Sequence, residues 1–112
     1  GELLAKPDPQ APAAITDLLT GYENHAGATH LGPDARPLAQ VEFGVGNGDG
    51  SEGAISGQVL GTYLHGPCLA RNPQVADVLL GWVVGENLPA LVEREVEELR
   101  AERLEFVRRS GR

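Results

Sequence analysis

The sequence has little of several residue types on which common protein classes depend. Its 112 residues include one cysteine and no methionine. The single cysteine, Cys68, excludes an internal disulfide and a zinc site built on paired thiolates, and it fits a reducing, cytoplasmic setting. The sequence also has no apolar run long enough to cross a membrane and no basic start followed by an apolar stretch. It therefore predicts neither a membrane span nor an export signal.

Positive charge is also scarce in this sequence. Nine basic residues stand against 16 acidic ones, which gives a formal net charge of -7. An acidic surface repels phosphate groups, so nucleic acid and anionic lipid are disfavoured as partners.

The remaining composition predicts one small folded unit. Hydrophobic residues make up 41% of the chain and charged residues 22%, as in ordinary globular proteins. We expect residues 1–112 to form a single partial domain, because this length supports one core. The start on Gly1 instead of methionine indicates a segment of a longer protein. Such a segment exposes a sheet edge, which predicts self-association or pairing with the missing part.

Extended structure is expected in the first two thirds of the chain. Three prolines at positions 7, 9 and 12 predict that residues 1–14 form a loop or connector, with regular structure beginning only after it. Apolar and alternating segments bounded by glycine, proline and asparagine are typical of strands. The expected strands are 18–25, 28–31, 38–45, 53–57 and 59–64. The last of these is apolar enough to predict a buried strand.

Helical patterns follow the strands. Asn72 is placed to cap a helix that begins at Pro73 and ends at Gly85, with apolar residues at helical spacing between them. Pro89 is expected to open a second, terminal helix within residues 86–112, which mixes apolar residues with many Glu and Arg. Strands followed by two helices predict either an α+β domain or the carboxyl-terminal part of an α/β domain.

Three histidines are the first candidates for proton transfer, because imidazole titrates near neutrality. His65 directly follows segment 59–64, which places it at the carboxyl end of an expected strand, where open α/β sheets gather catalytic groups. The alternative is a histidine that only ends a strand. His30 is expected on the surface, and the three histidines lack the short spacing of a zinc site.

A second polar cluster follows the first expected strand. Glu23, Asn24 and His25 bring a carboxylate, an amide and an imidazole together, with Gly27 close behind. These residues predict the wall of a substrate pocket, and the alternative is a hydrogen-bonded turn with Glu23 in solvent.

Two other features have simpler interpretations. Segment 44–50, GVGNGDG, lacks the Lys-Ser/Thr pair of a phosphate-binding loop and the regular carboxylates of a calcium loop, so it predicts a hairpin loop. Cys68 does not lie on a glycine-flanked elbow, which indicates a packed thiol instead of a nucleophile.

Two motifs in a fixed order carry a family resemblance. Segments 21–29 (GYENHAGAT) and 61–67 (GTYLHGP), with the glycine-rich loop between them, resemble the carboxyl-terminal part of the CobB/CobQ-like class I glutamine amidotransferases. Within that family the chain is most similar to the GatD type, the glutaminase subunits of lipid II isoglutaminyl synthases. The resemblance implies an α/β fold, here the carboxyl-terminal part of a flavodoxin-like domain.

The resemblance also implies a reaction. In the family a cysteine thiolate attacks the side-chain amide of glutamine, and a histidine moves the proton; His65 matches that histidine. The ammonia would pass to a partner similar to Mur ligases (the MurT type), which amidates the stem peptide of lipid II. That partner would hold ATP and Mg, so no cofactor is expected in this chain.

The sequence departs from the family pattern at two points. No Gly-x-Cys-x-Gly segment precedes the two motifs, so the nucleophile is absent and this segment alone is expected to be inactive. Many class I amidotransferases carry a Glu two residues after the histidine, where this chain has Pro67. The carboxylate that orients His65 would then come from Glu23, from the missing amino-terminal half or from the partner.

Two other functions remain open from the sequence. One is a cobyric-acid-synthase-like amidotransferase of cobalamin biosynthesis, which would carry its own synthetase domain. The other is a non-catalytic interaction module that docks a partner through the charged terminal helix. A solvated surface helix is the simpler explanation of those charges.

Overall fold

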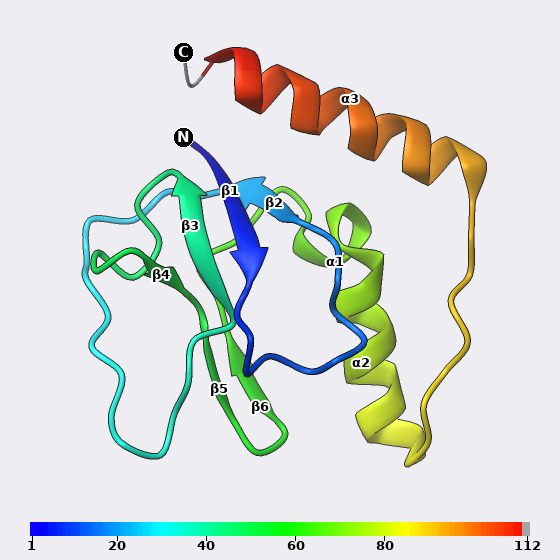
Figure 1. Ribbon diagram of the computed structural model, residues 1–112, viewed down its shortest axis with the longest axis horizontal. Coiled ribbons are helices and arrows are strands. Elements are labelled where there is room, and N and C mark those ends of the chain that lie inside the picture. The colour runs from blue at the N-terminus through cyan, green and yellow to red at the C-terminus, as the bar shows by residue number, and fades with distance from the viewer. Residues whose placement is uncertain (111–112) are drawn as a thin grey trace.

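A four-stranded sheet forms the centre of the protein. The computed structural model describes residues 1–110. Strand β1 (Glu2–Pro7) lies between β2 (Leu19–Tyr22) and β3 (Ala39–Phe43), and β4 (Ser51–Glu52) pairs with the far side of β3 (Figure 1). A separate two-stranded sheet joins β5 (Ala54–Ser56) to β6 (Val59–Gly61).

All the strand pairings in residues 1–110 are antiparallel. Leu3 faces Gly21 on one side of β1, and Leu4 faces Phe43 on the other. A register shift between Leu4 and Ala5 interrupts the pairing with β3, which bends the central strand at that point.

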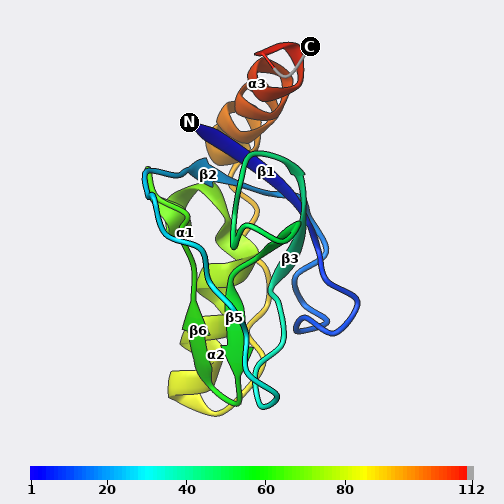
Figure 2. The same cartoon turned by 90° about the vertical axis from the view of Figure 1, so that its left-hand side faces the viewer.

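Three helices follow the strands, so the expected order of α/β elements is confirmed. The short α1 (Cys68–Arg71) runs directly into α2 (Pro73–Val84), and a connection without regular structure leads to α3 (Arg94–Ser110). Figures 1 and 2 show α2 beside the β5–β6 hairpin, whereas α3 lies beyond the end of the sheet near the N-terminus. None of these helices has the length and apolar character needed to cross a bilayer.

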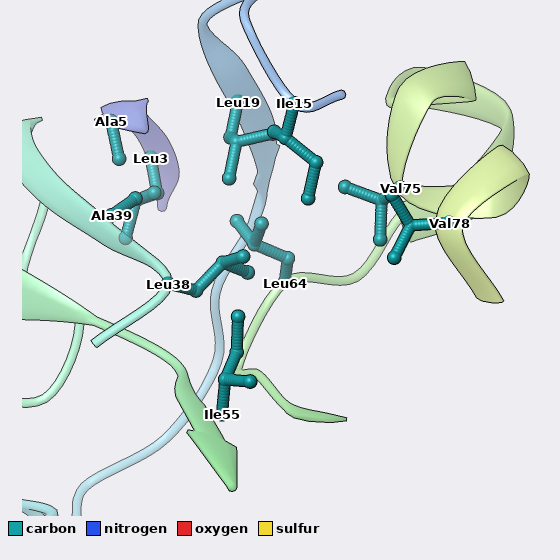
Figure 3. Close-up of a cluster of buried hydrophobic side chains, with 10 residues drawn as sticks. All are labelled: Leu3, Ala5, Ile15, Leu19, Leu38, Ala39, Ile55, Leu64, Val75 and Val78. Atoms are coloured by element: carbon teal, nitrogen blue, oxygen red, sulfur yellow. The ribbon is translucent and has the colours of Figure 1, made fainter. Parts of the chain in front are cut away.

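One hydrophobic core joins the sheets to α2. The cluster includes residues of β1, β2, β3 and β5, and Figure 3 shows Ile15 and Leu64 next to Val75 of α2. The buried members of this cluster are Leu3, Ala5, Ile15, Leu19, Leu38, Ala39, Ile55, Leu64, Val75 and Val78. All of these side chains are aliphatic, so the core contains no fully buried aromatic ring, in keeping with the low aromatic content.

The prediction that residues 1–14 form a loop was wrong for their first half. Glu2–Pro7 is the central strand of the main sheet, and Leu3, Leu4 and Ala5 are all buried in it. A central strand buried on both faces shows no polar alternation, so the pattern that reveals half-exposed strands is absent here. Residues 8–14 do form an irregular connection.

Two other strand predictions were corrected. Residues 28–31 form a loop instead of a strand, in which Thr29 N–H donates to the Asn47 carbonyl. Segment 59–64 is not a buried strand: β6 ends at Gly61, and Val59 is 70% exposed. Its buried residue is Leu64, beyond the strand.

The helix ends also differ in part from expectation. Helix α2 begins at Pro73 and is closed by Gly85 with φ 78°, as predicted. Asn72 precedes the helix, but its side chain makes no cap hydrogen bond. The terminal helix starts at Arg94, five residues after Pro89, and most of its residues are exposed. The four-residue α1 was not predicted.

The loop 44–50 is a hairpin connection between β3 and β4, as predicted. Gly44, Gly46, Gly48 and Gly50 all have positive φ. This succession of left-handed residues lets the loop turn back without the strain that other residues would suffer.

Two glycines around the β5–β6 hairpin form a matched test of crowding. Gly53 and Gly57 have φ values of 72° and 58°, but a Cβ at Gly53 would lie 2.8 Å from Leu38 Cβ, whereas Gly57 has open space. We expect Gly57→Ala to lower the free energy of unfolding by about 1 kcal/mol, the cost of a left-handed alanine. Gly53→Ala should cost about 3 kcal/mol because overpacking adds to that strain. Urea denaturation measures both, and equal losses would contradict the crowding.

Candidate functional site

His65 combines a fixed backbone with an exposed side chain. Its N–H donates to the Tyr22 carbonyl at 2.7 Å, and its carbonyl accepts from Tyr22 N–H at 3.0 Å. This isolated antiparallel bridge extends the β2 side of the main sheet by one residue pair. The expectation that His65 lies at the end of a buried strand was wrong, because β6 ends at Gly61 and His65 forms an isolated bridge beyond it.

Glycines on both sides of this bridge permit the close approach. A Cβ at Gly21 would lie 2.7 Å from Leu64 Cδ2 and 3.1 Å from the His65 carbonyl oxygen. Gly66 has φ 81°, which turns the chain from His65 into α1. A side chain at the first position would displace Leu64, and the positive φ at the second favours glycine.

Asn72 ties β2 to the segment that follows His65. Its Oδ1 accepts from Thr20 N–H at 2.9 Å, and its Nδ2 donates to the carbonyls of Thr20 and Cys68, each at 2.8 Å. Arg100 of α3 adds a longer contact to Oδ1. Because Asn72 is 2% exposed, these bonds are shielded from water. They hold the His65–Cys68 turn against β2.

Glu23 is buried and fully engaged. Its carboxylate accepts hydrogen bonds from the N–H groups of Val45 and Gly46 and from Nε2 of His25. Burial acts to raise the pKa of this carboxyl, but the bonds from His25, Gly46 and Val45 outweigh it, so the pKa lies below its ordinary value. The expectation that Glu23 might stand in solvent at a turn was wrong.

Two hydrogen-bond acceptors beside His25 favour its protonated form. Its Nε2 lies 3.0 Å from Glu23 Oε2, and its Nδ1 lies 3.0 Å from the Gly27 carbonyl oxygen. Both partners only accept hydrogen bonds, so the ring needs a proton on each nitrogen. The bonds to Glu23 and Gly27 accordingly raise the pKa of His25. The ring also stacks on Tyr63, with 3.7 Å between centroids and 6° between planes.

These contacts decide which residues are free to act. Within residues 1–110 both Glu23 oxygens are used by His25 and the hairpin backbone, and none of its hydrogen bonds reaches His65. His25 has no free nitrogen for proton transfer. Asn24 is exposed. A substrate-binding role for this trio stays a prediction, and within residues 1–110 no hydrogen bond joins Glu23 to His65.

Glu52 is a buried residue that sequence reasoning missed. It is completely shielded, and its Oε1 accepts from the Thr62 hydroxyl and from Tyr63 N–H. Its Oε2 has no hydrogen-bond partner within residues 1–110. A glutamate beside a glycine-rich loop is normally solvated, so the sequence contains no signal for this role. The contact supports the segment that leads into His65.

The remaining sequence candidates lie apart from this site. Cys68 packs against the core, as expected for a packed thiol, and burial raises its pKa. A raised pKa disfavours the thiolate that a nucleophile requires. His30 is exposed, as predicted. Among residues 1–110, no group of three or more His, Cys, Asp and Glu side chains is placed to hold a metal ion.

Comparison with known proteins identifies the family to which this chain belongs. Residues 6–73 match the model of the CobB/CobQ-like glutamine amidotransferase domain. The chain belongs to this family. The matched region holds the Glu23–His25 pair, the glycine-rich hairpin and His65, whereas α3 lies outside it.

Individual relatives agree with the family over part of their length. The chain is 47% identical over 58 residues to the lipid II isoglutaminyl synthase (glutamine-hydrolyzing) subunit GatD of Streptococcus pneumoniae, covering 50% of this chain and 22% of that protein. It is 45% identical over 64 residues to the GatD subunit of Staphylococcus aureus, covering 55% and 26%. A probable cobyric acid synthase of Methanothermobacter thermautotrophicus is 48% identical over 52 residues, covering 45% and 10%. The chain thus matches a quarter or less of the length of most of these relatives.

The Glu23–His25 pair makes stability depend on pH in two directions. Stability from His25 is complete below the ordinary imidazole pKa of 6.5 and is lost as pH rises through the raised folded value. Stability from Glu23 is complete above the ordinary carboxyl pKa of 4.5 and is lost as pH falls through the lowered folded value. In the wild type, the urea concentration at the unfolding midpoint should fall as pH rises above 6.5. We expect this fall to be smaller in His25→Gln. His30→Gln, at an exposed histidine, should leave that decline intact, and an unchanged decline in His25→Gln would contradict the pairing.

The Asn72 contacts have a solvent-exposed counterpart that serves as a control. Gln74 Oε1 accepts from the N–H groups of Thr16 and Asp17, also at 2.8 Å, but at the surface. Asn72→Ala leaves buried polar groups of Thr20 unpaired and should lower the free energy of unfolding by about 3 kcal/mol. Gln74→Ala should cost less than about 1 kcal/mol because water replaces its bonds. If chemical denaturation showed similar losses of unfolding free energy for the two variants, the buried hydrogen bonds of Asn72 would not have this stabilising role.

Proposed function

We propose that this chain supplies the proton-transfer histidine, His65, of a glutaminase that converts glutamine and water to glutamate and ammonia. One observation carries the proposal: within the family-matched region, His65 presents an exposed imidazole on a backbone held by two hydrogen bonds. His25 has both nitrogens occupied, and His30 lies in an irregular loop. His65 is therefore the histidine best placed for chemistry.

The reaction needs a nucleophile and a proton carrier. A cysteine thiolate attacks the side-chain carbonyl carbon of glutamine, and the imidazolium of His65 gives its proton to the departing ammonia. The neutral imidazole then takes a proton from water as the water attacks the thioester. Collapse of the tetrahedral intermediate expels the cysteine thiolate and releases the side chain of glutamate as a carboxylic acid, whose proton passes through solvent to ammonia. The thiolate and the imidazolium of His65 are thereby restored. Rigid support of the His65 backbone favours both transfers, because misplacement of a catalytic group is costly.

The nucleophile in this proposal comes from outside the 112 residues. Cys68 is unsuited because it is partly buried with a raised pKa and follows His65 by three residues. Relatives four times or more longer than the matched segment leave ample room for a cysteine elsewhere. The 112-residue segment alone is then inactive. The group that orients His65 also lies outside it, since Pro67 has no carboxylate and Glu23 is engaged.

The proposed destination of the ammonia is a synthetase that amidates the stem glutamate of lipid II. Two relatives named as GatD subunits of lipid II isoglutaminyl synthase, each at least 45% identical over half the chain, support this choice. The synthetase would be a separate Mur-ligase-like subunit of the MurT type. ATP and Mg would bind to that partner and not to this chain.

A second candidate shares the glutaminase chemistry but has another acceptor. Similarity to a probable cobyric acid synthase, 48% over 52 residues, favours an amidotransferase of cobalamin biosynthesis. The two candidates differ in where the synthetase lies. A long polypeptide with its own synthetase domain would support the cobalamin enzyme, and a short glutaminase subunit would support the GatD type.

The decisive experiment measures glutamate release by the full-length protein, with and without a Mur-ligase-like synthetase, for wild type and His65→Ala. Loss of a general acid and base should lower kcat by roughly a hundredfold or more. His30→Ala removes an exposed imidazole and should retain activity. An active His65→Ala protein, or a wild type inactive in every combination, would contradict the proposal.

A further inference from the structure

A cleft lined in part by Gly66 and Pro67 has no role in the proposed chemistry. It has a volume of about 360 Å³ and lies between α1 and the inner face of α3, with Thr20 of β2 in its wall. Three arginines line it: Arg71 from α1, and Arg100 and Arg103 from α3. Because Gly66 and Pro67 also contribute, the cleft begins one residue beyond His65.

The charges around this cleft do not balance. Glu2 pairs with both Arg71 and Arg103 and is the one carboxylate that contacts them within residues 1–110. Arg100 is buried and donates to the main-chain carbonyls of Arg71 and Leu18. Three guanidinium groups thus line the cleft, whereas one carboxylate, Glu2, contacts two of them, in a chain whose overall charge is -7. A local excess of positive charge at partly buried sites favours an anion.

The arginines keep donors in reserve for such an anion. Arg71 directs Nη2 to Glu2 and Thr20, and Arg103 directs Nη2 to Glu2. Neither Nη1 group takes part in a hydrogen bond within residues 1–110. Arginine binds carboxylates through such paired N–H groups, so one further carboxylate fits the bonding pattern already present with Glu2.

Apolar side chains also line the cleft. Val96 and Leu99 come from α3 and Ala70 from α1, and Leu99 is 61% exposed. A volume of about 360 Å³ is at the small end of ligand pockets. The occupant that matches this mixed lining is therefore small, with one negative end and one aliphatic end.

We propose that this cleft binds a small aliphatic carboxylate, whose charged end meets Arg71 and Arg103 and whose chain lies against Leu99 and Ala70. The site is separate from the glutaminase chemistry, and it does not depend on the function proposed for His65. Amino acids such as glutamate are poor ligands for it, because their ammonium group would face the excess positive charge.

The test uses hexanoate as the probe, with the 112-residue chain at low ionic strength, and follows amide and arginine side-chain signals by NMR. We expect saturable shifts at Ala70 and Arg103. The neutral isostere hexanamide should bind at least several-fold more weakly because it lacks the charge, and acetate should do so because it lacks the aliphatic part. Glutamate should produce no saturable shift in the cleft.

Two variants separate this site from a general salt effect. Arg103→Gln should weaken hexanoate binding roughly tenfold, as expected for one charged contact, whereas Arg109→Gln removes the same charge from an exposed pair with Glu105 and should bind normally. Ala70→Phe fills the cleft without a change in charge and should abolish binding, with circular dichroism confirming that each variant is folded. Equal binding by Arg103→Gln and Arg109→Gln, equal binding of hexanoate and hexanamide, or undiminished binding by Ala70→Phe would each overturn the proposal.

Discussion

The amide of Asn72 holds together the parts of this protein that define its candidate site. It forms hydrogen bonds with both backbone groups of Thr20, with the carbonyl of Cys68 at the start of α1 and, at longer range, with Arg100 of α3. Two residues beyond Thr20, the same strand forms the double hydrogen bond with His65. The backbone that carries the imidazole of His65 is therefore supported by the side chain of Asn72, seven residues further along the chain. The hydrogen bonds of Asn72 are buried, so water does not replace them when they are lost.

Hydrogen bonds to buried polar groups fix segments of the chain that the small hydrophobic core does not reach. The aliphatic cluster fills the space between the sheets and α2, but the loops around the site are fastened by Glu23 and Glu52. Each of these carboxylates accepts backbone N–H groups from a segment distant in sequence. Glycine-rich loops have few side chains to pack, so hydrogen bonds to their amides are the available means of fixing them.

Sequence patterns predicted the elements whose signals are local. Helix α2 has a proline at its start, a glycine at its end and apolar spacing between them, and β3 with its hairpin loop has alternation followed by glycines. Strand β1 was missed because its pairing partners lie on both sides of it and its three consecutive residues Leu3, Leu4 and Ala5 are all buried, which leaves no alternation in the sequence.

The candidate site was predictable only in part for the same reason. The exposed His65 follows from a short motif, and that motif lies in the family-matched region. The engagement of Glu23 with the 45–46 backbone, the buried Glu52 and the clamp at Asn72 all join segments more than ten residues apart. Such contacts arise from the folded arrangement, and residue spacing does not encode them.

The attachment of α3 has a consequence for how freely neighbouring positions can change during evolution. Arg100 donates to the main-chain carbonyls of Leu18 and Arg71, so this part of the contact recognises backbone atoms that every residue possesses. Substitution at position 18 would leave the acceptor in place, whereas replacement of Arg100 would remove the donor. Helix α3, which lies outside the family-matched residues 6–73, would in this way remain attached when side chains beneath it are replaced.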